Sequence, residues 1–261
     1  MPPNSESRLR RAARLLDPLH QHSACSAAVL LSATVLLSRV LGYLREAYIA
    51  YAFGAGPETD AYVAAFTLPD WLNYLVAGGT ASITFLSIFT RYVSAGREEE
   101  AKKAFNVILT VMTAVLVAGV GAVAVFAPEL ERLLFPRFAE EQLRLCVGLT
   151  RILLPAQLFF YTGGVVSAVL MSRRQFFYPA LAPLLYNVGI IAGGVLLGGK
   201  LGVAGLAAGA VAGSFAGPFL VNAIGAHKAG MRYRVSWETG HPGFREWIAL
   251  TIPLMLGVTL V

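Results

Sequence analysis

Two arginines lie inside the first long apolar run of the sequence, residues 26–53. If this run spans a membrane, Arg39 and Arg45 raise its free energy of insertion, because an arginine near the centre of a spanning helix costs about 2.5 to 3.5 kcal/mol. Such a residue usually faces a water-filled cavity or a partner, where its guanidinium stays charged and offers a planar fork to phosphate oxygens. The pair therefore indicates binding of an anion, above all a phosphate, within a membrane.

Helical geometry relates the polar residues of this run to one another. Arg39 and Arg45 would lie about 120° apart around the helix and about 9 Å apart along it, so both can border one wide cavity. Ser38, Gly42 and Arg45 share a stripe, on which Gly42 allows a ligand or a neighbouring backbone to come close. Glu46 is better placed to pair with a charge on another helix or to lie near the outer interface.

Carboxylates follow in the second apolar segment. Asp60 comes directly after the sequence Pro-Glu-Thr at 57–59, a pattern typical of a helix start, so helix capping competes with a functional role. Asp70 and Asn73 lie one turn apart, and Asp70 is a candidate cavity carboxylate or cation site. The structural alternative for the arginines of the first run is that they reach a membrane interface or pair with Asp60 or Asp70.

A third intramembrane arginine, Arg151, stands in the fourth apolar segment ahead of Pro155. It lies about two turns from the start of that segment, so a cavity and a membrane interface are both open to it. Pro155 and Pro183 predict kinks.

The predicted gating or ion-binding residues are Asp60, Asp70 and Glu46. The predicted substrate-binding residues are Arg39, Arg45, Ser38, Gly42, Arg151 and Asn73.

No pattern of catalytic or metal-binding residues stands out. The histidines have no metal-ligand spacing within a predicted span, and Cys25 and Cys146 are far apart and read as small apolar residues. The acidic run at 98–100 is typical of a solvated helix start beside Arg97 and Lys102. We therefore expect no catalytic residues, metal or cofactor.

Composition points to the elements that must hold these residues. Of 261 residues, 56% are hydrophobic and 14% are charged, whereas soluble domains carry about 25% charged residues. The net charge of +6 does not indicate nucleic-acid binding, because the basic residues fall between apolar runs rather than on one face. The sequence predicts an all-α, polytopic membrane bundle with no large soluble domain.

Six spans and the start of a seventh are predicted, since a spanning helix needs about 20 apolar residues. The second and fourth are long enough to be tilted or kinked. The last apolar run, of 14 residues, is too short to cross a bilayer of about 30 Å, so we expect a fragment or one lobe of a longer protein. The spans are 26–53, 60–92, 102–126, 142–171, 179–197 and 203–226, with a seventh from 246.

Basic residues between the spans predict orientation, because cytoplasmic loops are enriched in lysine and arginine. One side collects 14 of them and the other side four. We expect a cytoplasmic basic segment over 1–25, a six-span lobe over 26–226, a cytoplasmic linker over 227–245 and the start of a seventh span over 246–261. The 14 are Arg8, Arg10, Arg11, Arg14, Arg91, Arg97, Lys102, Lys103, Arg173, Arg174, Lys228, Arg232, Arg234 and Arg245, and the four are Arg132, Arg137, Arg144 and Lys200.

Several motifs together resemble the MurJ/MviN family of lipid II flippases, within the exporter superfamily that also holds the MATE drug antiporters. The resemblance runs from about Leu36 to the end, and its motifs are specific jointly rather than singly. The motifs are SRVLGYLRE at 38–46, FGAG at 53–56 with TDA at 59–61, Leu68-Pro69, Thr150-Arg151 with Pro155, RQF at 174–176, PALAP at 179–183 and Asn187.

This resemblance implies a fourteen-helix, two-lobed transporter of the bacterial inner membrane with a cationic central cavity. It would move an undecaprenyl-pyrophosphate-linked peptidoglycan precursor by alternating access, with Arg39 and Arg45 on the pyrophosphate and Asp60 in gating or lobe contact. Its partners would be this lipid-linked sugar, membrane lipid and a C-terminal lobe. Two departures leave a related lipid-linked oligosaccharide open, because Asn73 stands where the family commonly has arginine and Gly78 where it has an acidic residue.

Three other functions compete with this one. An ion-coupled MATE-type exporter of drugs or cations would use Asp60 and Asp70 as its central groups. A membrane enzyme acting on polyprenyl phosphates would need clustered carboxylates to hold a metal on the phosphates, and the sequence has no such cluster within a span. A scaffold that transports nothing is the third. We expect a transporter rather than an enzyme.

Overall fold

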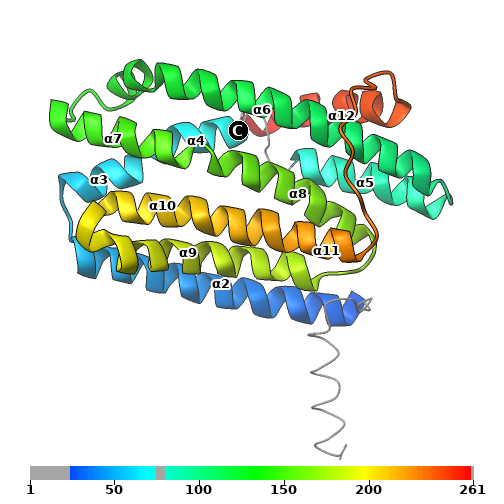
Figure 1. Cartoon of the computed structure of the whole chain (residues 1–261), viewed down its shortest axis with the longest axis horizontal. Coiled ribbons are helices and arrows are strands. Elements are labelled where there is room, and N and C mark those ends of the chain that lie inside the picture. Colours follow the sequence, from blue (N-terminus) through cyan, green and yellow to red (C-terminus); the bar gives the residue numbers. More distant parts are fainter. Residues whose placement is uncertain (1–23, 75–79, 260–261) are drawn as a thin grey trace, which may run out of the picture.

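The computed structural model describes residues 24–74 and 80–259, and all regular structure within them is helical. Five stretches are long and apolar enough to cross a membrane, judged by length and composition. The prediction of an all-α bundle of membrane helices is confirmed, and Figure 1 shows the helices side by side in an elongated bundle. The five stretches are Cys25–Phe53, Glu98–Leu134, Glu140–Ser172, Phe177–Leu201 and Val203–Lys228.

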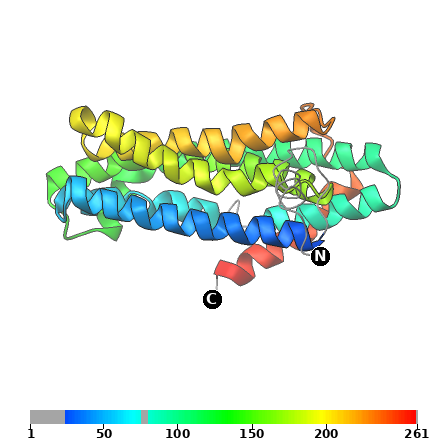
Figure 2. The same cartoon turned by 90° about the horizontal axis from the view of Figure 1, so that it is seen from below.

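The first helix is α2 (Ala24–Phe53), which packs mainly on α9 (Phe177–Leu201). Figure 2 shows α2 and the end of α12 (Pro242–Thr259) on one side of the bundle and α10 (Val203–Ser214) on the other. Much of α2 stays uncovered, and Leu36, Tyr43 and Tyr51 are among its exposed apolar side chains. Residues 1–23 of the predicted N-terminal basic segment lie outside the described residues.

The segment predicted as the second span is interrupted. It forms α3 (Pro57–Ala64), α4 (Thr67–Leu72) and α5 (Thr80–Ser94), and Gly78 lies outside the described residues. The interpretation of Asp60 as a helix cap was wrong, because Gly56 precedes the helix and Pro57 opens it, so Asp60 lies in the first turn. Proline suits this opening position, where its missing N–H costs no helical hydrogen bond.

The fourth predicted span is also broken, into α7 (Glu140–Leu153) and α8 (Ala156–Ser172). Pro155 stands at the junction, as the predicted kink requires. Pro183, in contrast, lies inside α9 without ending it. Helices α3 and α4 both pack on α7, so the two interrupted segments meet.

Glycines bring α9 and α10 into backbone contact. A Cβ atom on Gly193 would lie 2.4 Å from the carbonyl oxygen of Gly205, and one on Gly189 would lie 2.5 Å from the Cα atom of Gly213. Such distances are shorter than any real side chain permits. Membrane helices associate through this kind of close packing, because lipid is as apolar as the helices and supplies no hydrophobic driving force.

The remaining helices complete the bundle. Helix α6 (Glu98–Leu134) runs its full length, and α10 continues through the wider helical turns of η2 (Phe215–Val221) into α11 (Asn222–Lys228). Helix α12 packs on α5 and α6, where the fully buried Trp247 donates its Nε1 hydrogen to the carbonyl oxygen of Ala81 at 3.0 Å.

Connections between helices separate into two groups at opposite ends of the bundle. The α5–α6, α8–α9 and α11–α12 connections lie at one end, and the α2–α3, α6–α7 and α9–α10 connections lie at the other (Figure 1). The first group carries the described basic residues that the sequence assigned to one side. The cytoplasmic assignment of this basic end stays a prediction.

Candidate functional site

A cavity of about 630 Å³ opens among α2, α3, α4 and α9. This volume lies within the range of 300 to 1,000 Å³ that small-molecule sites usually have. Charged residues on its wall come from three elements: Arg45 and Glu46 from α2, Asp60 from α3 and Asp70 from α4. The sequence predicted each of these four residues as a site residue, and the fold brings them to one space.

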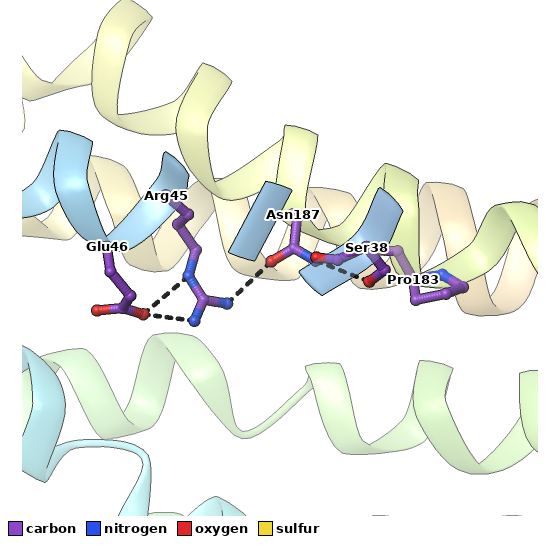
Figure 3. Close-up of polar contacts among 5 residues, drawn as sticks. All are labelled: Ser38, Arg45, Glu46, Pro183 and Asn187. Atoms are coloured by element: carbon purple, nitrogen blue, oxygen red, sulfur yellow. Dashed lines mark hydrogen bonds and ion pairs between the residues drawn. The ribbon is translucent and has the colours of Figure 1, made fainter. Parts of the chain in front are cut away.

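Arg45 is the fixed point of this cavity (Figure 3). Its Nη1 atom donates to Oδ1 of Asn187 on α9 at 3.1 Å, and its Nε atom donates to Oε1 of Glu46 at 3.1 Å. The Nη2 atom of Arg45 pairs with the same Glu46 oxygen. The Arg45 side chain is 26% exposed and that of Glu46 is 62% exposed, so the guanidinium is held against the protein while its carboxylate partner remains open to solvent.

Asn187 is itself held by two other groups. Its Nδ2 atom donates to Oγ of Ser38 at 3.3 Å and to the carbonyl oxygen of Pro183 at 3.0 Å (Figure 3). Because the amide nitrogen is engaged there, the amide oxygen is directed at Arg45. Gly42 faces the same amide, since a Cβ atom added to it would lie 3.9 Å from Oδ1 of Asn187. The predicted stripe of Ser38, Gly42 and Arg45 therefore packs on Asn187.

The charge balance of the lining differs from a purely cationic site. Among the residues that line the cavity, one arginine stands with three carboxylic acids, Glu46, Asp60 and Asp70. An arriving phosphate would have to replace Glu46 on the outer edge of the Arg45 guanidinium, which the exposure of Glu46 permits. Across the described ranges, no group of histidine, cysteine, aspartate and glutamate side chains is close enough to hold a metal ion.

A second cavity of about 230 Å³ adjoins the first and shares Phe66, Asp70 and Tyr186 with it. Its wall adds Asn73 and Gln157. The Oε1 atom of Gln157 is buried and has no hydrogen-bond partner within the part of the chain that the structure describes. The second cavity therefore offers polar groups beyond Asp70, and Asn73, a predicted substrate residue, lies among them.

Two predicted arginines lie elsewhere. Arg39 is exposed, lines neither cavity and makes no hydrogen bond or ion pair with any described residue. Arg151 is also exposed and lines neither cavity, and its Nε atom donates to the carbonyl oxygen of Ala124 on α6 at 2.9 Å. The structure therefore does not place Arg39 or Arg151 beside Arg45.

Asn187 and Gln157 were not predicted as site residues. Asn187 is an isolated amide in an apolar helix, one turn after Pro183, and Gln157 follows Pro155 closely. The signal available in the sequence was a neutral polar side chain inside a predicted span. Such a side chain often forms hydrogen bonds to a neighbouring helix. Attention to charge alone passes over such residues.

Comparisons with known proteins agree with this arrangement. The sequence matches the family described as "Lipid II flippase MurJ" over residues 49–261. It is 31% identical over 242 residues to the lipid II flippase MurJ of Burkholderia cenocepacia, covering 90% of this chain and 47% of that protein. A solved structure titled "Lipid II flippase MurJ, inward closed conformation" superposes with a TM-score of 0.72 at 25% identity, covering 87% of this chain and 47% of that one.

A multidrug resistance MATE family transporter in its outward-facing conformation shares the fold, with a TM-score of 0.67 at 17% identity and coverage of 93% of this chain and 54% of that one. The chain spans less than half the length of the curated relatives it matches.

Proposed function

The chain belongs to the MurJ family of lipid II flippases, and from this premise we propose that it serves to translocate lipid II, or a related undecaprenyl-pyrophosphate-linked oligosaccharide, across the bacterial inner membrane. In this proposal the substrate is a peptidoglycan precursor for the cell wall. The protein would act as a transporter and not as an enzyme, moving its substrate by alternating access together with a C-terminal lobe.

The observation that carries this proposal is the fixed guanidinium of Arg45 beside an open cavity. Asn187 occupies one N–H group, so the guanidinium keeps its orientation when Glu46 leaves. The edge that Glu46 occupies is the one a pyrophosphate oxygen would take, through charge-assisted hydrogen bonds of the same kind. Glu46 would thus hold the site in the absence of substrate and give way to it.

Other residues have supporting roles in the proposal. Asp60 and Asp70 line the same cavity from α3 and α4, the two short helices of an interrupted segment, and would respond to movement there as gating groups. Asn73 would contact the sugar portion of the substrate in the adjoining cavity. Arg39, exposed on α2, would meet the substrate or the C-terminal lobe outside this cavity, and Arg151 would hold α7 to α6 near it.

Orientation is part of the same proposal. The N-terminus and the 227–245 linker would be cytoplasmic, supported by the gathering of basic residues at one end of the bundle. Residues 26–226 would form the N-terminal lobe, and α12 would begin the following span.

The decisive experiment is rescue of cells depleted of their own lipid II flippase. Arg45→Ala should abolish rescue at normal protein level, and Arg45→Lys should restore little of it, because lysine lacks the planar fork. Arg144→Ala removes an exposed arginine at the opposite end of the fold from the basic loops and is the matched control. Full rescue by Arg45→Ala would remove the basis of the proposal.

An ion-coupled exporter of cations is the second candidate, and the three carboxylic acids on the cavity wall favour it. Asp70→Asn separates the two functions. A flippase that binds phosphate through Arg45 should keep partial rescue in this variant, because Asp70 would then act in gating and not in binding the substrate. Loss of cation efflux in Asp70→Asn, with rescue absent from the unaltered protein, would support the exporter instead.

A further inference from the structure

A further cavity, of about 720 Å³, is lined by helices that contribute no residue to the Arg45 cavity. Helices α6 and α11 both pack on α8, and the cavity is lined by these three helices together with η2 and residues 231–233. We call it the α8 groove. Along α11 and η2 it extends from His227 to Phe219, eight residues or about 12 Å of helix.

The wall of the α8 groove is mostly apolar. Phe105 and Leu109 contribute from α6, Leu158 and Phe159 from α8, and Phe219 from η2. A groove of this length and character in a membrane protein accommodates hydrocarbon, since an apolar surface in a bilayer is filled by lipid chains rather than by water.

Basic side chains stand at one end of the groove only. Arg232 and His227 line it there and are exposed, and their side chains make no hydrogen bond or ion pair with any residue that the structure describes. Three other basic residues at the same end of the bundle have acidic partners: Arg91 pairs with Glu246, Arg97 with Glu100 and Lys102 with Glu99. Arg232 thus places one unpaired positive charge at the mouth of the groove.

The connection from α11 to α12 holds this mouth in place. It crosses the bundle from α11 (Figure 1), and its backbone N–H of Arg234 donates to Oδ1 of Asn106 on α6 at 3.0 Å. The hydroxyl groups of Tyr233 and Thr110 are 2.8 Å apart. On the other side, Nη1 of Arg173 donates to the carbonyl oxygen of Ala229 at 2.6 Å. The position of Arg232 is therefore set by bonds of this connection to α6 and to Arg173, the residue directly after α8.

We propose that the α8 groove binds an anionic phospholipid, with an acyl chain along the apolar wall and the phosphate at Arg232 and His227. Basic pockets between membrane helices near the interface recognise anionic headgroups in this way. The lipid would join α6, α8 and α11 without entering the Arg45 cavity, as a structural lipid.

Native mass spectrometry of the detergent-purified protein tests this proposal, with dioleoyl phosphatidylglycerol and dioleoyl phosphatidylcholine as probes. The unaltered protein should retain phosphatidylglycerol in preference. Arg232→Gln should weaken that retention about fivefold, the factor that corresponds to about 1 kcal/mol per basic residue near anionic lipid. Arg234→Gln is the control, because it removes the same charge from the same connection without lining the groove.

A second pair of variants tests the apolar wall. Ala223→Phe places a ring in the groove and should also weaken retention, whereas Ile224→Phe, at an exposed neighbouring position outside the groove, should not. Equal retention of the two lipids, or unchanged phosphatidylglycerol retention in both Arg232→Gln and Ala223→Phe, would overturn the proposal. Retention of a polyprenyl phosphate that exceeds that of phosphatidylglycerol and is lost in Ala223→Phe would also overturn it, by assigning the groove to a substrate tail. None of these outcomes depends on Arg45, so this test and the rescue experiment can fail independently.

Discussion

Asn187 on α9 accepts a hydrogen bond from Arg45 on α2 at 3.1 Å and ties the cavity arginine to the helix on which α2 packs. The contact joins residues 142 positions apart in the sequence. The amide of Asn187 thus fixes one edge of the Arg45 guanidinium. The other edge, which Glu46 occupies, stays available to a different anion.

Replacing this amide should impair both stability and transport. Asn187→Ala removes the partner of Arg45 Nη1, and leaving such a group unpaired costs about 1 to 3 kcal/mol. We expect a lower midpoint of thermal unfolding in detergent and reduced rescue of flippase-depleted cells. Asn222→Ala is the control, because Asn222 is also buried and also bonds a proline carbonyl one turn earlier, but lies on α11. Equal loss of rescue in both variants would contradict a specific role for Asn187.

The glycine contact between α9 and α10 predicts a strong position dependence on one helix. Gly193→Ala would place a methyl group 2.4 Å from the Gly205 carbonyl oxygen, whereas Gly199→Ala would meet nothing within 4 Å. Forcing atoms into a filled contact costs about 1 to 3 kcal/mol. Thermal unfolding should therefore shift downward for Gly193→Ala alone. A similar unfolding midpoint for the two variants would show that α9 and α10 are farther apart than described.

The sequence was sufficient to predict the helical class, the approximate ends of the long helices and a place for Arg45 on a cavity wall. These properties are local, because an apolar run of sufficient length must be helical in a bilayer and a charge within it must find water or a partner. The interruption of 60–92 was less evident. Pro57 and Pro69 were visible there, but the apolar character of the segment continues past the positions where its backbone bends.

The direction in which a side chain points was harder to predict than the helix to which the residue belongs. The spacing of Arg39 and Arg45 allowed one shared cavity, yet only Arg45 lines it, because the side of α2 that is covered depends on where α9 packs. The bonds of Asn187 to Ser38 and Arg45 likewise depend on two distant helices meeting. Contacts of this kind leave no periodic trace in either helix.

Helix α12 should depend on a single buried indole. Trp247→Phe keeps an aromatic ring but removes the Nε1 donor to the Ala81 carbonyl oxygen, so we expect a loss of about 1 kcal/mol in the free energy of unfolding. Trp237→Phe alters a side chain that is 63% exposed and should leave stability unchanged. Denaturant titration of the purified protein followed by circular dichroism measures both. No difference between the two would argue against docking of α12 through this indole.

The orientation of the bundle can be checked with single cysteines at its two ends. The exposed Cys25 is first replaced by serine. A membrane-impermeant maleimide applied to intact spheroplasts should label Arg137→Cys, in the α6–α7 connection, and should label Ala95→Cys, in the α5–α6 connection, only after permeabilisation. The reverse pattern would place the basic end outside the cytoplasm and overturn the predicted topology.

The backbone contact between α9 and α10 also limits how this lobe can move. Two helices in backbone contact through glycines have no side chains between them that could repack. We therefore expect α9 and α10 to move as one rigid body. Arg45 is hydrogen-bonded to Asn187 on α9. Asp60 and Asp70 lie on α3 and α4, two short helices separated by a break. A movement of α3 and α4 relative to α9 would therefore change the separation between the Arg45 guanidinium and the carboxylates of Asp60 and Asp70, and with it the electrostatic attraction across the cavity.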